Sequence, residues 1–383
     1  MLTLSREILH LDMDTFFVSV ERLCNSRLNN KPVMIGGTSD RGVVACCSYE
    51  TRRFGVHAGM PMKMAKQLCP ESVIIRGDMD LYSKYSDMVT GIIAEKAPVY
   101  EKMSVDEHYI DLTGMDRFFG ALRWSHELRQ NILKNTGLPL SFGLSTNKTV
   151  AKIATGEAKP NGEKFVEKYE VGNFLHPLSI RKIPGIGEKN FRLLRTMGLA
   201  TIGQLSSMPR ELMQKVMGKN GLEVWEKANG IDLRPVKPYW EQKSIGTERT
   251  FEQDSTDIKH MHEILRCMVE KLAWELRCQQ KLTACVTVKI RYANFDTHTL
   301  QQRISYTSFD HELAAVASSL FGRLYTRRML IRLIGVKFSH LVSGVQQLDL
   351  FDPDPRLARL YQAMDRVRGR FGQKSIRTAA AMR

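Results

Sequence analysis

Three carboxylates in two short segments have the chemistry and the spacing of a metal site. Asp12 ends an apolar run that starts at Ile8, and Asp106 and Glu107 lie in a second segment, Ser104–Asp111. Each segment predicts a buried β-strand that delivers its acids to the end of the strand, although acids are also common where strands simply run into loops. If the strands are neighbours in one sheet, the carboxylates converge, and such a cluster of like charges persists only with cations between them. Hard divalent ions on carboxylate oxygens are the ions that phosphoryl transfer uses.

The elements that must position these acids belong to several domains, because 383 residues are too many for a single core. Up to residue 165 the pattern mixes the two element types. It predicts helices over 18–29 and 81–96 and strands over 31–37 and 41–49.

Residues 166 to 232 have a different pattern. Ile183–Gly187 followed by a helical run predicts a helix-hairpin-helix, whose glycine turn exposes backbone N–H groups at a helix start. Such a turn binds phosphate without reading base sequence, so Gly185, Gly187 and Lys189 are candidate DNA contacts. The alternative is a Pro-Gly turn between ordinary helices.

Two later strands predict a basic sheet face after a linker over 233–243. In Thr283–Tyr292 apolar side chains alternate with polar and basic ones, which puts Lys289 and Arg291 on one face. Arg332–Ser339 is a second such strand and carries Lys337. A small α+β domain that presents a basic sheet to a DNA duplex fits these strands, and a solvated sheet face is the alternative.

Composition indicates the kind of partner. The formal net charge of +15 favours a polyanion such as nucleic acid, or less readily an acidic membrane face, over a basic surface without a partner. The seven cysteines include no CxxC pair, and adjacent Cys46 and Cys47 are poorly placed to bridge each other, so we expect a reduced, intracellular protein. With no leader and no apolar stretch of membrane-spanning length, we expect it to be cytoplasmic and without a membrane partner.

These segments, in this order, resemble the Y-family of translesion DNA polymerases, most closely its DinB branch. The two acidic segments are similar to its metal-binding motifs, Ser244–Phe251 is similar to the entry of its little-finger domain, and the resemblance covers most of the chain. It implies an α+β multidomain, right-hand polymerase. The implied parts are palm (1–17 and 79–165), fingers (18–78), helical thumb (166–232), linker (233–243), little finger (244–341) and a tail with a clamp-binding peptide and a basic helix (342–383).

The resemblance implies a template-directed DNA polymerase that extends a primer 3′ end with low fidelity across damaged template bases. Two Mg²⁺ ions are expected, with Asp12 and Asp106 bridging both, Glu107 on the ion that activates the 3′-hydroxyl, and the carbonyl of Met13 on the nucleotide-side ion. Asp14 is expected to be structural. The implied partners are primer–template DNA and a deoxynucleoside triphosphate, bound by a monomer.

The negative charges of the triphosphate must be balanced by cations. Tyr49–Gly55 resembles the fingers motif in which Tyr49 and Arg52 grip the β- and γ-phosphates, and Lys159 is expected to add a charge from the palm. Without the resemblance, these would be ordinary surface residues.

Two aromatic rings and three small residues complete the expected nucleotide pocket. Strand alternation would put Phe16 and Phe17 on opposite faces, so that one ring fills the core. By resemblance Phe17 is the steric gate, a ring that leaves no room for a ribose 2′-hydroxyl; alternatively, both rings are core. Val43, Ala45 and Cys46 correspond to a small roof over the nascent base pair, and a small roof tolerates distorted template bases.

Two residues depart from the family's pattern. His108 stands where the family usually carries alanine; it could touch the primer or pyrophosphate, but we favour a structural role inside the palm. Cys46 replaces a small hydroxyl residue of some relatives.

The tail carries two signals. Gln347–Phe351 resembles the pentapeptide that binds the bacterial sliding clamp, with Gln347 making polar contacts and Leu348, Leu350 and Phe351 completing the motif. Beyond Pro355, apolar residues at helical spacing surrounded by arginines predict an amphipathic basic helix. That helix could pack on the little finger, follow DNA or bind a partner.

Two other functions use the same acids. A two-metal nuclease would need the carboxylates but not Phe17, Tyr49 or Arg52. A non-catalytic scaffold on the polymerase fold predicts loss of the carboxylates, and all three are present.

Overall fold

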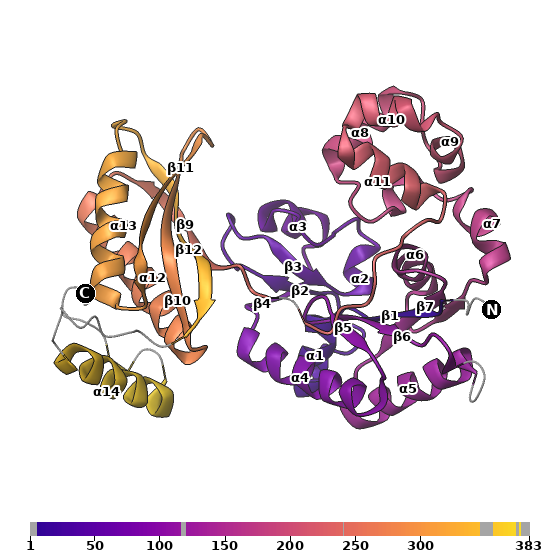
Figure 1. Ribbon diagram of the computed structural model, residues 1–383, viewed down its shortest axis with the longest axis horizontal. Coiled ribbons are helices and arrows are strands. Elements are labelled where there is room, and N and C mark those ends of the chain that lie inside the picture. The colour runs from indigo at the N-terminus through magenta and orange to yellow at the C-terminus, as the bar shows by residue number, and fades with distance from the viewer. Residues whose placement is uncertain (1–5, 116–119, 240, 345–354, 373–374, 377–383) are drawn as a thin grey trace. The chain divides into compact units, whose positions relative to one another are not determined.

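The computed structural model describes residues 6–115, 120–239, 241–344, 355–372 and 375–376 (Figure 1). The chain divides into two compact units, Met1–Trp240 and Glu241–Arg383, and both mix helices with sheets, as predicted. Among the described residues, no helix is both long and apolar enough to cross a membrane. All seven cysteines lie in the described residues as free thiols, so Cys46 and Cys47 are not bridged.

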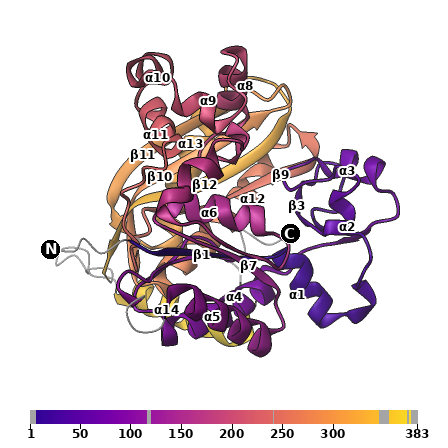
Figure 2. The same cartoon turned by 90° about the vertical axis from the view of Figure 1, so that its right-hand side faces the viewer.

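A five-stranded sheet in the first unit contains both acidic segments. The strand order is β5-β6-β1-β7-β8, and β1 pairs antiparallel with both of its neighbours. The strands are β1 (Ile8–Met13), β5 (Tyr100–Lys102), β6 (Glu107–Asp111), β7 (Leu140–Ser145) and β8 (Glu163–Phe165). Figure 2 shows α6 (Lys148–Ala158) over one face and α4 (Met79–Lys96) and α5 (Ala121–Thr136) over the other.

The alternation of β1 sends its side chains to two different layers. Leu9, Leu11 and Met13 pack into the apolar cluster that includes residues of α4 and α5. His10 and Asp12 point the other way and bond to residues in or next to α6. A strand covered on both faces explains the nearly continuous apolar run that the sequence shows.

A smaller three-stranded sheet follows β1 and α1, with strand order β3-β2-β4. Its strands and helices are α1 (Phe16–Cys24), the 3-10 turn η1 (Ser26–Leu28), β2 (Val33–Gly36), β3 (Val44–Cys47), α2 (Tyr49–Arg52), α3 (Met62–Leu68) and β4 (Val73–Ile75). The predicted helix over 18–29 thus starts earlier and ends earlier, at a cap formed by Asn25, whose side chain accepts a hydrogen bond from the backbone of Arg27.

Short helices make up residues 166 to 230, and their apolar side chains share one cluster with Val150, Ile153 and Ala154 of α6. The short helices are η3 (Lys168–Glu170), α7 (Val171–Leu175), η4 (Ile180–Lys182), α8 (Glu188–Thr196), α9 (Ile202–Ser206), α10 (Arg210–Met217) and α11 (Lys219–Ala228). Gly185 has a φ of 101°, which glycine adopts without strain, and Gly187 caps the start of α8.

The first half of the predicted linker is bound to the first unit. Thr149 donates a hydrogen bond to Asp232 at 2.8 Å, and Val236 packs against Ile8 and Tyr109. The backbone N–H of Lys237 donates to the carboxylate of Glu101 in β5 at 2.6 Å. The chain therefore leaves the sheet only after Lys237, later than the predicted start of the linker.

The second unit is a four-stranded antiparallel sheet with helices on one face. The strand order is β11-β10-β12-β9. Its elements are β9 (Ser244–Ser255), α12 (Ile258–Cys278), β10 (Lys281–Tyr292), β11 (Thr297–Thr307), α13 (Asp310–Leu324), β12 (Ile331–Ser343) and α14 (Pro355–Phe371). Its apolar cluster joins α12 and α13 to one face of the sheet, which leaves the other face for polar side chains.

Helix α14 packs on the helices of this second unit, one of the three roles that the sequence left open. Arg277 of α12 donates to both carboxylate oxygens of Asp365, at 2.6 and 3.0 Å. The Tyr361 hydroxyl and Nδ1 of His311 are hydrogen-bonded at 2.9 Å. Arg368 is almost fully buried and lies 3.6 to 3.9 Å from three carboxylates.

Candidate active site

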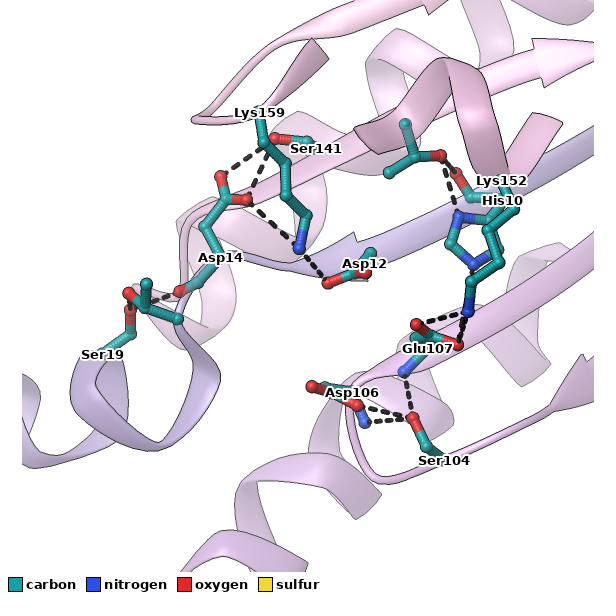
Figure 3. Close-up of polar contacts among 12 residues, drawn as sticks. His10, Asp12, Asp14, Ser19, Ser104, Asp106, Glu107, Ser141, Lys152 and Lys159 are labelled. Carbon is teal, nitrogen blue, oxygen red and sulfur yellow. Dashed lines mark hydrogen bonds and ion pairs between the residues drawn. The ribbon is translucent and has the colours of Figure 1, made fainter. Parts of the chain in front are cut away.

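The pairing of β1 with β6 brings the acidic segments together (Figure 3). Asp12 lies directly opposite Glu107, and the backbone N–H of Met13 donates to the carbonyl of Asp106 at 3.0 Å. One detail of the prediction is wrong: Asp106 and Glu107 precede or begin β6 instead of ending it. The acids converge nonetheless, because antiparallel pairing sets the start of one strand beside the end of the other.

Two lysine ammonium groups pair with two of the three acids. Lys159, next to the end of α6, donates to Asp12, and Lys152 of α6 donates to both oxygens of Glu107 at 2.7 and 2.6 Å. The sequence analysis singled out Lys159, as a residue that faces the triphosphate, but did not identify Lys152. The spacing of Lys148 and Lys152, one helical turn apart, was an available signal that this face of the helix is basic.

The two facing carboxylates have opposite pKa shifts. Burial is the largest influence on Asp12 and raises its pKa to about 6, although Lys159 acts in the opposite direction. For Glu107, burial alone would raise the pKa, but the neighbouring His10 ring and the hydrogen-bonded ammonium of Lys152 outweigh it and lower the pKa to about 2. Glu107 is therefore held as an anion, and Asp12 takes up a proton more readily.

A tight turn supports the third acid. The Ser104 hydroxyl donates to Asp106 at 2.5 Å, and its oxygen accepts from the backbone N–H groups of Asp106 and Glu107 at 3.3 and 3.1 Å. These contacts fix the carboxylate of Asp106 at the entry to β6. Sequence reasoning did not single out Ser104.

Asp14 has the contacts of a structural acid. It is buried, accepts from the hydroxyl of Ser141 at 3.1 and 2.9 Å, and accepts from the backbone N–H of Asn161 at 2.5 Å. The Tyr49 hydroxyl also donates to it, at 3.3 Å. Because its lone pairs serve these donors, Asp14 is a poor candidate for a metal ligand.

The donor set suits a hard divalent ion. Within the described residues, no group of three or more histidine, cysteine or acidic side chains forms a ready-made metal site. However, Asp12, Asp106, Glu107 and the Met13 carbonyl offer only oxygen atoms, the ligands that Mg²⁺ prefers. The lysine contacts show in addition that the cluster attracts positive charge.

The predicted phosphate-binding residues lie on α2, close to the acids. The oxygen of Ser48 accepts the N–H of Thr51 and starts this helix, and positions three apart then put Tyr49 and Arg52 on one face. The Arg52 guanidinium lies 4.9 Å from the centre of the Tyr49 ring. Burial, followed by the charge of Asp14, raises the pKa of Tyr49, so its hydroxyl stays protonated and can donate.

Phe16 and Phe17 lie in α1, so the argument from strand alternation is wrong. Thr15 adopts a φ of 44° and turns the chain from β1 directly into the helix. Phe16 is 2% exposed in the core, whereas Phe17 is half-buried and stacks on Tyr82 with ring centres 4.3 Å apart. As expected, the two rings differ in burial: Phe16 lies in the core and Phe17 is partly exposed. The buried ring of Phe16 is therefore unable to contact a nucleotide, contrary to its assignment to the nucleotide pocket.

The predicted roof residues differ in exposure. Val43 is 50% exposed and Ala45 is exposed, whereas Cys46 is half-buried and, like Phe17, packs against the apolar cluster of the five-stranded sheet. An irregularity in the pairing of β2 with β3 accompanies this change of face. Of these three roof residues, Val43 and Ala45 offer an open apolar surface and Cys46 does not.

The His108 side chain points into the interior of the first unit, which is the placement that a structural role predicts. It is buried, and its Nε2 is hydrogen-bonded to Thr90 of α4 at 3.1 Å. Burial and the charge of Lys102 lower its pKa to about 3, so the ring is neutral. It supports the sheet from the side opposite α6.

The predicted DNA contacts are at the surface. Gly185, Gly187 and Lys189 are exposed at the start of α8. On the second unit's sheet, Lys289 and Lys337 line a shallow hollow of about 340 Å³. The residues of the predicted clamp-binding peptide, Gln347, Leu348, Leu350 and Phe351, lie outside the described residues.

That sheet face is less uniformly basic than predicted. Glu248 of β9 accepts from Lys289 at 2.8 and 3.0 Å, and Arg291 donates to Thr297 at 2.8 Å. Sequence reasoning missed Glu248 because the pairing of β9 with β12 is not visible in a single sequence. Lys337 is exposed on the same face.

Comparisons with known proteins identify the family of the chain. Residues 11–156 match the impB/mucB/samB family model, and residues 242–350 match the model of that family's C-terminal domain. The chain is 37% identical to a DNA polymerase IV of Dehalococcoides mccartyi over 99% of this chain and 98% of that protein. It is also 37% identical to a DNA polymerase IV of Staphylococcus haemolyticus, over 91% of this chain and 98% of that protein.

Solved structures of similar fold point to the same class. A Y-family DNA polymerase chimera of Dbh and Dpo4 has a TM-score of 0.78 at 26% identity, covering 88% of this chain and 100% of that one. An insertion ternary complex of Dbh DNA polymerase has a TM-score of 0.63 at 26% identity, with the same coverage. Fold and site thus define a Y-family DNA-directed DNA polymerase of the translesion type. The chain belongs to the impB/mucB/samB family.

Proposed function

We propose that this polymerase joins a deoxynucleotide to a primer 3′ end by two-metal phosphoryl transfer at Asp12, Asp106 and Glu107. The observation that carries the proposal is the register of β1 and β6, which sets Asp12 opposite Glu107 and next to Asp106. The Met13 carbonyl would complete the ligand set. Two Mg²⁺ ions, when bound, would supply positive charge at the attacking and leaving oxygens.

Protein cations would hold the rest of the nucleotide. Tyr49 and Arg52 would bind the β- and γ-phosphates from α2, and Lys159 would exchange Asp12 for a phosphate oxygen. Their closeness supports this, since Tyr49 and Lys159 both contact Asp14 in the same corner of the palm. Phe17 would lie against the sugar and exclude a 2′-hydroxyl.

Low fidelity across damaged templates would follow from the small roof. Val43 and Ala45 are exposed and short, so a distorted template base would meet little steric resistance there. Cys46 faces away toward the core and would contribute less. Primer extension opposite a panel of damaged bases, compared with undamaged template, tests this part of the proposal.

The remaining features concern DNA and partners. Gly185, Gly187 and Lys189 on one unit and Lys289, Arg291 and Lys337 on the other would bind backbone phosphates without reading sequence. We further propose that Gln347–Phe351 binds the bacterial sliding clamp, that the enzyme is a cytoplasmic monomer, and that the domain boundaries follow the family's order.

Removing a carboxylate tests the chemistry directly. Asp106→Ala and Glu107→Ala should each reduce single-nucleotide incorporation by several orders of magnitude, because a lost ligand costs several kcal/mol of transition-state stabilisation. Primer–template affinity should hardly change. Substantial incorporation by both variants would contradict the assignment, and degradation of the primer by the wild type without nucleotides would favour a nuclease.

A further inference from the structure

The acid cluster contains one cation that the proposed reaction does not use. Lys159 leaves Asp12 for the triphosphate in that proposal, whereas Lys152 has no assigned role. Its ammonium nevertheless donates to both oxygens of Glu107, and the side chains of Lys152 and Glu107 are 36% and 21% exposed (Figure 3). A partly buried pair with two short contacts is stronger than an ordinary surface pair.

The surroundings of Glu107 make this cation necessary. Asp12 lies directly opposite, and Asp106 precedes Glu107 in the chain. The ring of His10 faces the same carboxylate, but its Nε2 is 3.9 Å away and the ring is hydrogen-bonded through Nδ1 to Thr155. Without Lys152, the three carboxylates would repel one another, and Lys159, which is bound to Asp12, would offset only part of that repulsion.

We propose that Lys152 is an internal counter-cation of the active site, which neutralises Glu107 in the free enzyme and thereby weakens the binding of divalent cations that arrive without a nucleotide. The inference rests on the proposed function, because it requires that Asp12, Asp106 and Glu107 be the metal ligands. Lys152 acts through Glu107 and is a positioning residue.

The physical reason is competition between like charges. The Lys152 ammonium must either give up Glu107 or remain beside a divalent ion, and both cost free energy. A nucleotide changes this balance, since its triphosphate offsets the crowded positive charge and offers Lys159 a new partner. The two lysines would thus make the site selective for a metal–nucleotide complex over the free metal.

Metal binding without DNA or nucleotide measures this effect. The probe is Mn²⁺, followed by electron paramagnetic resonance with the full-length protein. Lys152→Met keeps the aliphatic stem and removes the charge, so it should bind Mn²⁺ about three- to tenfold more tightly than the wild type, allowing for the partial exposure of the pair. Lys152→Arg keeps the charge and should bind as the wild type does.

Thermal unfolding gives a second readout. In EDTA, Lys152→Met should unfold at a lower temperature than the wild type, because Glu107 loses its partner. Saturating Mn²⁺ should raise the unfolding temperature of this variant more than that of the wild type.

A matched control and a site control make the test decisive. Lys102→Met removes one charge from a lysine that is 32% exposed and donates to Asp87 at 3.0 Å, and it should leave Mn²⁺ affinity unchanged. Asp106→Asn should weaken Mn²⁺ binding; if it does not, the metal site itself is wrong and the inference falls with it. If Asp106→Asn does weaken binding but Lys152→Met binds Mn²⁺ no more tightly than the wild type, the counter-cation role is overturned while the metal site stands.

Discussion

Residues of the candidate active site hold one another in position by hydrogen bonds. Asp14 is the clearest case, because one buried carboxylate accepts hydrogen bonds from Tyr49, Ser141 and the backbone of Asn161. These donors come from α2, β7 and the segment after α6. Asp14 therefore positions Tyr49, the residue that we propose to bind phosphate, relative to the five-stranded sheet.

Phe17 is the residue for which the structure allows the sharpest mutational test. Phe17→Ala should admit ribonucleotides while deoxynucleotide incorporation continues, and sugar discrimination should fall at least tenfold, equivalent to about 1.4 kcal/mol. Single-nucleotide incorporation with matched ribo- and deoxynucleotides measures it. Phe16→Leu is the control: Phe16 is buried in the core, so this change should lower stability and leave sugar discrimination as it was. Unchanged discrimination in Phe17→Ala would make Phe17 a packing residue for Tyr82.

The site residues that sequence reasoning found and missed differ in a physical way. Asp12, Asp106 and Glu107 follow or precede apolar runs, so their unusual surroundings are visible in the sequence. Lys152 lies on a helix among residues of mixed character, where a lysine is ordinarily solvated, and only the packing of α6 over β1 reveals its partner. Local sequence patterns predict strands, but they do not predict which face of a helix packs on those strands.

Helix α6 can hold its lysines over the acids because β7 offers it a flat surface. Gly143 of β7 has no side chain, and a Cβ there would lie 2.3 Å from the carbonyl oxygen of Ala151 and 2.5 Å from the backbone nitrogen of Thr155. The helix backbone thus approaches the sheet more closely than any other residue would allow.

Gly143→Ala should therefore push α6 away from the sheet. We expect a loss of about 1–3 kcal/mol in the free energy of unfolding from overpacking. Incorporation should also fall, since Lys159 moves with the helix.

Gly156→Ala on the same helix is the control, because its added Cβ meets nothing within 4 Å. That change should be neutral or stabilise by up to about 1 kcal/mol. Denaturant unfolding of both variants compares them, and equal stabilities would contradict the close-approach argument.

Element types were predicted well and their junctions less well. The antiparallel neighbours β1 and β6 were expected as buried strands, and β10 and β12 as half-buried ones. The start of α1 was missed because it depends on the left-handed backbone of Thr15, which threonine seldom adopts and no local pattern announces. Junctions of this kind depend on tertiary packing that only the folded chain contains.

At the scale of the whole molecule, the net charge of +15 favours binding to nucleic acid, and the two units differ in the charged residues that they carry. The first unit carries the acids, and the second carries a sheet face with Lys337 and Lys289 but also Glu248. Phosphate contacts of this kind are sensitive to salt and blind to sequence, so an isolated enzyme should dissociate readily from its primer.

Recruitment by a sliding clamp would offset that weakness by raising the local concentration of the polymerase. Replacing Leu350 and Phe351 together by alanine should leave single-nucleotide insertion intact and remove stimulation by the bacterial clamp, because two apolar anchors supply most of a short peptide's binding energy. Primer extension with and without the clamp measures this. Replacing the neighbouring Gln346 by alanine is the control and should preserve stimulation; stimulation that survives the double substitution would move the contact elsewhere.

The balance of charges on the second unit's sheet predicts two changes of opposite sign. Lys337→Ala should weaken primer–template binding equally for all sequences and reduce the slope of log affinity against log salt by about 0.9, the value for one phosphate contact. Glu248→Gln should do the reverse, because it releases Lys289 from an ion pair of 2.8 Å.

The control for both is Lys271→Ala, which removes an equal charge from α12, the helix that packs on the other face of the sheet. Affinity measured across a salt series should separate the three variants. If Lys271→Ala weakens binding as much as Lys337→Ala, the DNA responds to net charge alone. The sheet face of the second unit would then be a solvated surface, and the predicted helix-hairpin-helix turn at Gly185 and Gly187 would become the first place to look for DNA contacts.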